Sequence, residues 1–234
     1  MPGLSAIEWT DRTWNPVTGC TAVSPGCDNC YAERIATRFK KDFSKVELHP
    51  ERLKIPISWK SPSRIFVNSV SDLFHPEVPF EFVQQVFDIA SACERHIFQV
   101  LTKRPSRMKH FNGVWPQNVW AGTSIENAEY KWRIDQLRLV PASIRFLSIE
   151  PLIGPVGKLD LDGIDWVIVG GESGPGHRPL SEDWVTEIKL QCDAGGVAFF
   201  FKQWGGHTSK AGGRELDGRV WNAMPEGIMT SNAI

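Results

Sequence analysis

A repeated alternation of short apolar runs and helical patterns constrains the fold of this chain most strongly. In the segment 71–95, for example, Phe80, Val83 and Phe87 recur at the spacing of one helix face. Strands that alternate with helices in this way predict a parallel sheet, either closed as a barrel or open and doubly wound. The apolar, strand-like runs occupy residues 64–70, 96–102, 118–124, 144–150, 165–171 and 196–204, after a first stretch at 13–19.

Polar residues at the ends of these runs favour the barrel. In a (β/α) barrel the functional side chains collect at the carboxyl ends of many strands, whereas a doubly wound sheet concentrates them at one switch point. We therefore expect an incomplete (β/α) TIM-like barrel with six or seven parallel strands. Its strand-end clusters are Asn68-Ser69, Thr102-Lys103, Thr123-Ser124, Glu150, Gly170-Gly171-Glu172 and Lys202-Gln203.

Length and charge bound the remaining possibilities. With 234 residues and 41% hydrophobic content, residues 1–234 are expected to form a single barrel domain, ending in a loop-rich extension over about 205–234. The 26 basic and 27 acidic residues nearly balance, so any binding of nucleic acid has to be local. The chain shows neither a long apolar run nor a signal-peptide pattern, which predicts a cytoplasmic protein without a membrane contact.

Three of the five cysteines, Cys20, Cys27 and Cys30, fall within the segment GCTAVSPGCDNCYAE. Thiolates are soft ligands that select iron–sulfur clusters, zinc or copper(I), and the bend at Pro25-Gly26 returns the chain toward Cys20. A structural zinc site has four protein ligands, whereas three cysteines on a four-iron cluster leave one iron open for chemistry. The spacing therefore predicts an open metal centre.

The alternative interpretation is a zinc site completed by a histidine such as His49 or His75. The other two cysteines, Cys93 and Cys192, lie on the apolar faces of expected helices, where a free cysteine behaves as a small hydrophobic residue. They are not expected to supply the fourth ligand.

A CxxCY motif directly before a helix, with a third cysteine upstream and a βα series downstream, resembles the radical S-adenosylmethionine superfamily. The first gap between cysteines is six residues here, where that superfamily usually has three. The blocks NPVTGCTAVSPGCDNCYAE, SVSDLFHPEVP, VLTKRPSR, SIEPLIGP, VIVGGESGPGHRP and FFFKQWG further resemble an uncharacterised phage- and prophage-associated family, over roughly residues 7–205. These resemblances imply a barrel, a 4Fe-4S cluster, S-adenosylmethionine and an electron donor for the cluster.

Ligands for S-adenosylmethionine are expected among the polar and glycine residues that follow the strands. Each also has a plainer interpretation as a turn or helix cap; Ser124, for instance, is a natural N-cap for a helix carrying Tyr130, Ile134 and Leu137. Glycines let the backbone approach a ligand closely. The candidates are Asn68, Ser69, Ser71, Asp72, Ser124, Glu126, Asn127, Gly170, Gly171 and Ser173.

The candidate catalytic residues are Glu150, Glu172 and Lys103. A carboxylate at the end of an apolar strand, such as Glu150, is costly unless it is paired or part of a site. Lys103, with Arg104 beside it, stands where it can bind a carboxylate or a substrate phosphate. We expect radical chemistry on an unknown substrate, with nucleic acid or a nucleotide as the first guess. The alternatives are a non-catalytic zinc module that binds nucleic acid, and a metal-independent hydrolase that uses Glu150 and Glu172.

Overall fold

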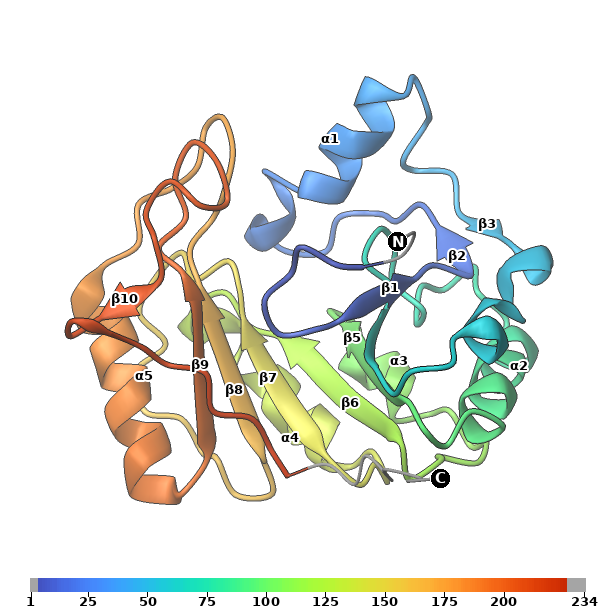
Figure 1. The fold of residues 1–234 in the computed structure, drawn as a ribbon. Helices are drawn as coiled ribbons and strands as arrows, with labels where there is room; N and C mark the ends of the chain where they lie inside the picture. Colours follow the sequence, from blue (N-terminus) through green and yellow to red (C-terminus); the bar gives the residue numbers. More distant parts are fainter. Residues whose placement is uncertain (1–3, 227–234) are drawn as a thin grey trace.

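A computed structural model describes residues 4–226 of the chain (Figure 1). One seven-stranded sheet, entirely parallel, runs through the molecule in the order β1-β4-β5-β6-β7-β8-β9. The sheet curls into half a barrel, so the expected incomplete (β/α) barrel is confirmed. Its strands are β1 (Arg12–Trp14), β4 (Arg64–Val67), β5 (Ile97–Thr102), β6 (Val119–Ser124), β7 (Arg145–Ile149), β8 (Trp166–Gly170) and β9 (Ala198–Gln203).

Helices connect most of the strands, and two small antiparallel ladders lie outside the main sheet. No helix among residues 4–226 combines the length and the apolar character needed to cross a bilayer. The helices are α1 (Tyr31–Arg38), α2 (Phe80–Ser91), α3 (Pro105–Met108), α4 (Trp132–Arg138) and α5 (Glu182–Gly195). The ladders pair β2 (Val17–Thr18) with β3 (Glu47–Leu48), and β10 (Glu215–Leu216) with β11 (Arg219–Val220).

Alternation of side chains along each strand divides the core into two layers. On β7, Leu147 and Ile149 belong to the larger cluster, which includes the buried faces of α2, α4 and α5. Phe146 points to the other face, where it packs with the buried rings of Trp9, Trp166 and Phe200. Side chains that share the Phe146 face therefore fill the concave interior of the half-barrel, below the carboxyl ends of the strands.

A glycine in the interior layer shows how tightly the half-barrel is packed. A Cβ atom on Gly122 of β6 would lie 2.3 Å from the Phe146 ring on the neighbouring strand. The absence of a side chain on Gly122 therefore makes room for the Phe146 ring. Pairing a small residue with a large one in this way fills the narrow interior of a curled sheet.

The element pattern read from the sequence matches the structure apart from two details. Ser124 is the last residue of β6 and not a helix N-cap, because α4 begins only at Trp132, with Lys131 at its cap position. The first stretch, at 13–19, does not form one strand, because β1 ends at Trp14 and Val17–Thr18 pair with β3 in a separate ladder. The expected loop-rich extension after residue 205 carries β10 and β11, and its last part, 227–234, lies outside the described residues.

Candidate functional site

A cavity of about 810 Å³ opens at the carboxyl ends of the strands, above the interior layer. The three clustered cysteines all line it, although they come from a loop that crosses the top of the half-barrel. Ten of the thirteen candidate catalytic and cofactor-binding residues also line it, namely Asn68, Ser69, Ser71, Asp72, Lys103, Ser124, Glu150, Gly171, Glu172 and Ser173. The arrangement matches the usual location of active sites in (β/α) barrels.

The loop of residues 20–30, called the cysteine loop below, follows a path fixed by backbone contacts. Gly19 has a left-handed φ of 87°, and a Cβ atom there would lie 2.0 Å from the Lys45 carbonyl oxygen. The next residue, Cys20, donates its N–H to the Phe43 carbonyl at 2.8 Å. A short 3-10 turn over Pro25–Cys27 then reverses the chain, and Cys30 stands at the start of α1. All three thiols are free and partly exposed.

Asp72, which follows β4, holds the first end of this loop through Arg104. The buried carboxylate accepts hydrogen bonds from Thr102 Oγ1 at 2.7 Å and from Arg104 Nη1 at 2.9 Å. Arg104 in turn donates to the Thr21 carbonyl at 2.8 Å and approaches Cys20 Sγ at 3.5 Å. Burial, reinforced by the Asp72 charge, raises the pKa of the Cys20 thiol to about 11.

Glu126, which follows β6, holds the middle of the loop. Its fully buried carboxylate pairs with Arg133 of α4 at 2.9 Å and with Lys103 at 3.2 Å. It also accepts a hydrogen bond from Ser24 Oγ of the loop at 2.7 Å. A Cβ atom on Gly26 would lie 2.4 Å from the Glu126 side chain, so the glycine brings the loop backbone onto this carboxylate.

Glu172, which follows β8, holds the last part of the loop. It accepts hydrogen bonds from Asn29 Nδ2 at 2.9 Å and from Arg178 Nη2 at 2.5 Å. Arg178 also donates to the carbonyl of Pro25 at 2.8 Å. Burial acts to raise the pKa of Glu172, but the hydrogen bonds from Arg178 and Asn29 outweigh it, so the pKa lies below its usual value.

A further ion pair lies inside the cavity itself. Lys202 Nζ of β9 contacts Glu150 Oε1, directly after β7, at 2.5 Å, and both residues line the cavity. Gly170 of β8 lies between the two strands, and a Cβ atom there would be 3.0 Å from Glu150 Oε1. The glycine therefore leaves room for the pair to form across the concave face.

Three buried polar side chains on the cavity wall have atoms without a hydrogen-bond partner among the described residues. Asn68, directly after β4, leaves both its amide oxygen and its amide nitrogen unpaired. Gln203 leaves its side-chain oxygen unpaired, and Trp9 leaves its indole N–H unpaired. Buried polar groups are normally paired, so unpaired ones on a cavity wall indicate where a polar ligand is received.

The cavity leaves out three of the sequence candidates for cofactor binding. Glu126 is buried behind the cysteine loop, as described above. Asn127 accepts a hydrogen bond from the Glu129 N–H and caps a 3-10 turn over Ala128–Tyr130, which is the turn-cap alternative noted for such residues. Gly170 contributes space for Glu150 and no contact of its own to the cavity.

The two histidines considered for a zinc site are occupied by other contacts. The Nδ1 atom of His75 accepts the Glu77 N–H at 3.2 Å, so a neutral ring carries its proton on Nε2, which lies 2.8 Å from Thr21 Oγ1. His49 contacts Thr18 and Glu51 through its two nitrogens. Among residues 4–226, no group of three His, Cys, Asp or Glu side chains is arranged around a single-ion position.

Several residues of the site were missed by sequence reasoning or given other roles. Asn29 and Arg34 form hydrogen bonds to residues more than a hundred positions away in the chain. Arg178 joins Glu172, six positions before it, to the distant Pro25 carbonyl. Arg34 of α1 donates to the Ser173 carbonyl, and Gly174 packs against its guanidinium group. Arg104, predicted to bind a carboxylate or a substrate phosphate, pairs with the Asp72 carboxylate and holds Thr21.

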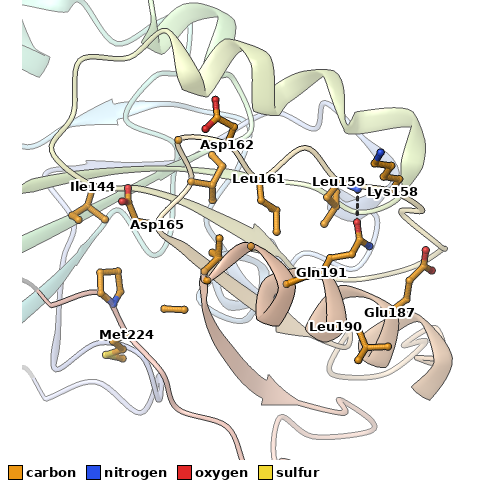
Figure 2. A pocket seen from close by; sticks show the side chains of 18 of the residues that line it. Ile144, Lys158, Leu159, Leu161, Asp162, Asp165, Glu187, Leu190, Gln191 and Met224 are labelled. Atoms are coloured by element: carbon orange, nitrogen blue, oxygen red, sulfur yellow. Dashed lines mark hydrogen bonds between the residues drawn. The ribbon is translucent and has the colours of Figure 1, made fainter.

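A second hollow lies at the opposite end of the sheet (Figure 2). It measures about 1270 Å³ and is bordered by Ile144, Asp165 and Ala198, at the amino ends of β7, β8 and β9. Gln191 of α5 lines it and accepts the Leu159 N–H at 2.6 Å. Although this hollow is larger, it contains none of the residues predicted from the sequence, and the amino ends of barrel strands serve stability.

Comparison with solved structures shows the fold of spore photoproduct lyase. A complex of that enzyme with dinucleoside spore photoproduct matches with a TM-score of 0.51 and 11% identity, over 80% of this chain and 62% of that one. A cysteine-to-serine mutant matches with a TM-score of 0.52 and 11% identity, over 82% and 63%. The chain thus spans less than two thirds of the structures it resembles, and at this identity the likeness concerns the fold.

The sequence comparisons give a family and no characterised relative. A search of curated proteins found no match. The model of the DUF5131 family, described as a protein of unknown function, matches residues 4–225. Since this match spans nearly the whole chain, the protein belongs to the DUF5131 family.

Proposed function

We propose that this protein is a radical S-adenosylmethionine enzyme that holds a 4Fe-4S cluster through Cys20, Cys27 and Cys30. The observation that carries the proposal is the position of these thiols on the wall of one cavity, beside the polar strand ends. Each cysteine of such a cluster ligates its own iron, so the thiolates have to face a shared space and not a single point.

The cavity wall suits the rest of the cofactor. Asn68 offers an acceptor for the ammonium group and a donor for the carboxylate of S-adenosylmethionine, since both ends of its amide are unpaired in the described chain. Ser124 and Ser148 place hydroxyl groups on the same wall, where they can bind ribose. Trp9, Phe66 and Leu101 form an apolar section that suits adenine. When bound, the cluster and S-adenosylmethionine supply a 5′-deoxyadenosyl radical that abstracts hydrogen from the substrate.

The fold supports the same class of chemistry. Spore photoproduct lyase, whose fold this chain shares, is a radical S-adenosylmethionine enzyme, and one of its structures holds dinucleoside spore photoproduct. In our proposal the strand ends orient the cofactor and substrate, and the enclosing walls keep water from the radical. Glu150 and Lys202 face the substrate, because their ion pair is inside the cavity and does not hold the cysteine loop.

The hydrolase alternative has less support from the geometry. It needs Glu150 and Glu172 as acid and base, but Glu172 is engaged by Arg178 and Asn29, whose hydrogen bonds keep its pKa low. The pKa of a general acid is raised instead.

Anaerobic purification tests the proposal directly. The reconstituted protein is expected to be brown, to contain about four iron and four sulfide per chain, and to form 5′-deoxyadenosine from S-adenosylmethionine after reduction. Cys27→Ala should lose most of the iron, while Cys93→Ala, a buried cysteine away from the loop, should keep it. A colourless protein with one zinc, or full iron content in Cys27→Ala, would refute the assignment.

A further inference from the structure

Helix α1 carries an apolar stripe that faces solvent. Tyr31, Ile35 and Phe39 follow each other at intervals of four residues and are 47%, 44% and 69% exposed. Only Ala32 of this helix is buried, and Figure 1 shows α1 projecting above the strands. A helix normally turns its apolar stripe toward the core, so an exposed one indicates a surface that binds a partner.

Basic side chains surround this stripe. Residues 31–41 contain four basic residues and one acidic residue, Glu33. Arg38, Lys40 and Lys41 are exposed, and within the described part of the chain none of them forms an ion pair. Just beyond, Asp42 accepts hydrogen bonds from Ser44, and Lys45 pairs with Glu47. The surface therefore has an uncompensated positive charge, in a chain whose total charge is −1.

The stripe lies at the mouth of the cavity described above. Tyr31, Glu33 and Arg34 line the cavity from α1, and Thr208 and Ser209 line it from the loop after β9. The exposed residues His207 and Lys210 flank that loop. On the cavity floor Lys103, Arg104 and Lys202 are each paired with a carboxylate, and Lys103 shares Glu126 with Arg133. On the α1 side, Arg34 donates to the Ser173 carbonyl and has no carboxylate partner among the described residues. Basic side chains without a carboxylate partner are therefore found on the rim.

We propose that this face of α1 binds single-stranded nucleic acid and directs one of its bases toward the cavity. Phosphates would contact Arg38, Lys40 and Lys41, while unpaired bases stack on the rings of Tyr31 and Phe39. The Tyr31 hydroxyl donates to the Ser69 carbonyl, so its ring is fixed in place as a stacking surface. The inference names a substrate class for the proposed function and rests on it only for the chemistry in the cavity.

Binding of a labelled oligonucleotide, followed by fluorescence anisotropy, tests the charged part of the surface. A strand of about 12 nucleotides lies within the site sizes of single-strand-binding proteins. The double variant K40Q/K41Q should bind more weakly. The slope of log K against log salt concentration should be shallower by about 1.4, which corresponds to two lost phosphate contacts. The matched control K54Q/K60Q changes two exposed lysines elsewhere and should bind like the unaltered protein.

The stacking part of the surface has its own pair of variants. Phe39→Ala should weaken binding by about tenfold, within the range for loss of one base stack. Leu139→Ala, at an equally exposed apolar position at the end of α4, should leave it unchanged. The same oligonucleotide annealed to its complement should bind less tightly, because its bases are no longer free to stack.

Equal binding by the α1 variants and their controls would overturn the proposal. A second result would also overturn it. If the α1 variants bind the oligonucleotide normally but a small acidic flavoprotein reduces their cluster more slowly, the face binds an electron donor and not nucleic acid. Iron content and 5′-deoxyadenosine formation, measured on the same preparations, report on the proposed function. A failure of nucleic-acid binding is therefore distinguishable from a failure of the cluster assignment.

Discussion

Glu126 is a fully buried carboxylate between two cations, and it contacts the cysteine loop through Ser24 and Gly26. Asp72 and Glu172 play the same part at the two ends of the loop. A buried charge is tolerated only when it is paired and hydrogen-bonded. Here the paired cations lie outside the loop, and the carboxylates or their arginines form hydrogen bonds to the loop. At the scale of single residues, we propose that these acids position the thiols through their contacts with the loop.

Replacement of Glu126 by Gln should therefore destabilise the fold and loosen the loop. Loss of one partner from a buried pair leaves Arg133 uncompensated, so we expect the free energy of unfolding to fall by about 3 kcal/mol. Asp135→Asn, the same change on an exposed pair of α4, should cost less than about 0.5 kcal/mol. Urea denaturation measures both, and equal midpoints for the two variants would contradict the role given to Glu126.

Helix α5 illustrates how an element ends where the sequence demands it. Gly195 is its last residue, and Gly196 adopts a left-handed φ of 65° at the C-cap, as expected for the Gly195-Gly196 pair. The cysteine loop, by contrast, could not be predicted in full from the sequence. The spacing of its cysteines is evident there, but the contacts that hold the loop are not, because Ser24 and Glu126 are 102 positions apart in the chain.

The two neighbouring glycines of α5 should respond to alanine with opposite signs. Gly196→Ala places a Cβ in open space but in a left-handed conformation, which costs about 1 kcal/mol. Gly195→Ala is helical and meets only an ordinary contact with Val197, so it should stabilise by up to about 1 kcal/mol. Thermal unfolding of the two variants checks this, and a shift of the midpoint in the same direction for both would show that the cap geometry is wrong.

Alternation and strand-end polarity were sufficient to predict the fold and the end of the sheet where the cavity lies. The roles of single residues were not predictable in the same way. Glu172 and Asp72 are predicted as site residues because they follow apolar strands, yet each carboxylate is engaged by an arginine, a pairing that is evident only in the structure. Asn68 was predicted as a ligand by position, and its unpaired amide on the cavity wall keeps it a candidate.

On the scale of the whole molecule, acid weakens this fold through groups spread over the core and the surface. His96 is fully buried, and burial followed by the charge of Arg95 lowers its pKa. Asp11 is paired with Arg64, and its pKa is lowered by that pair against the opposing effect of burial. For both groups the unfolded chain takes up a proton more readily, so stability falls as the pH falls.

The contribution of His96 to the free energy of unfolding should decline as the pH falls below about 6.5. It is complete above the unfolded pKa of about 6.5 and is lost as the pH drops toward the lower pKa of the folded chain. His96→Phe should therefore flatten the dependence of the urea midpoint on pH in this range. His207→Gln, at an exposed position, should leave the slope unchanged. If the urea midpoint of His96→Phe depends on pH as steeply as that of the unaltered protein, other groups cause the loss of stability in acid.

The three carboxylate anchors also bear on how the protein matures. Small zinc domains fold only when the metal arrives, because nothing else orders their ligands. In this chain the segment that carries the thiols is fastened to the strands by ion pairs, hydrogen bonds and a glycine contact that involve no metal. For the cluster proposed above, we therefore expect the loop to be ordered before iron arrives, because its contacts with the strands do not depend on the thiols.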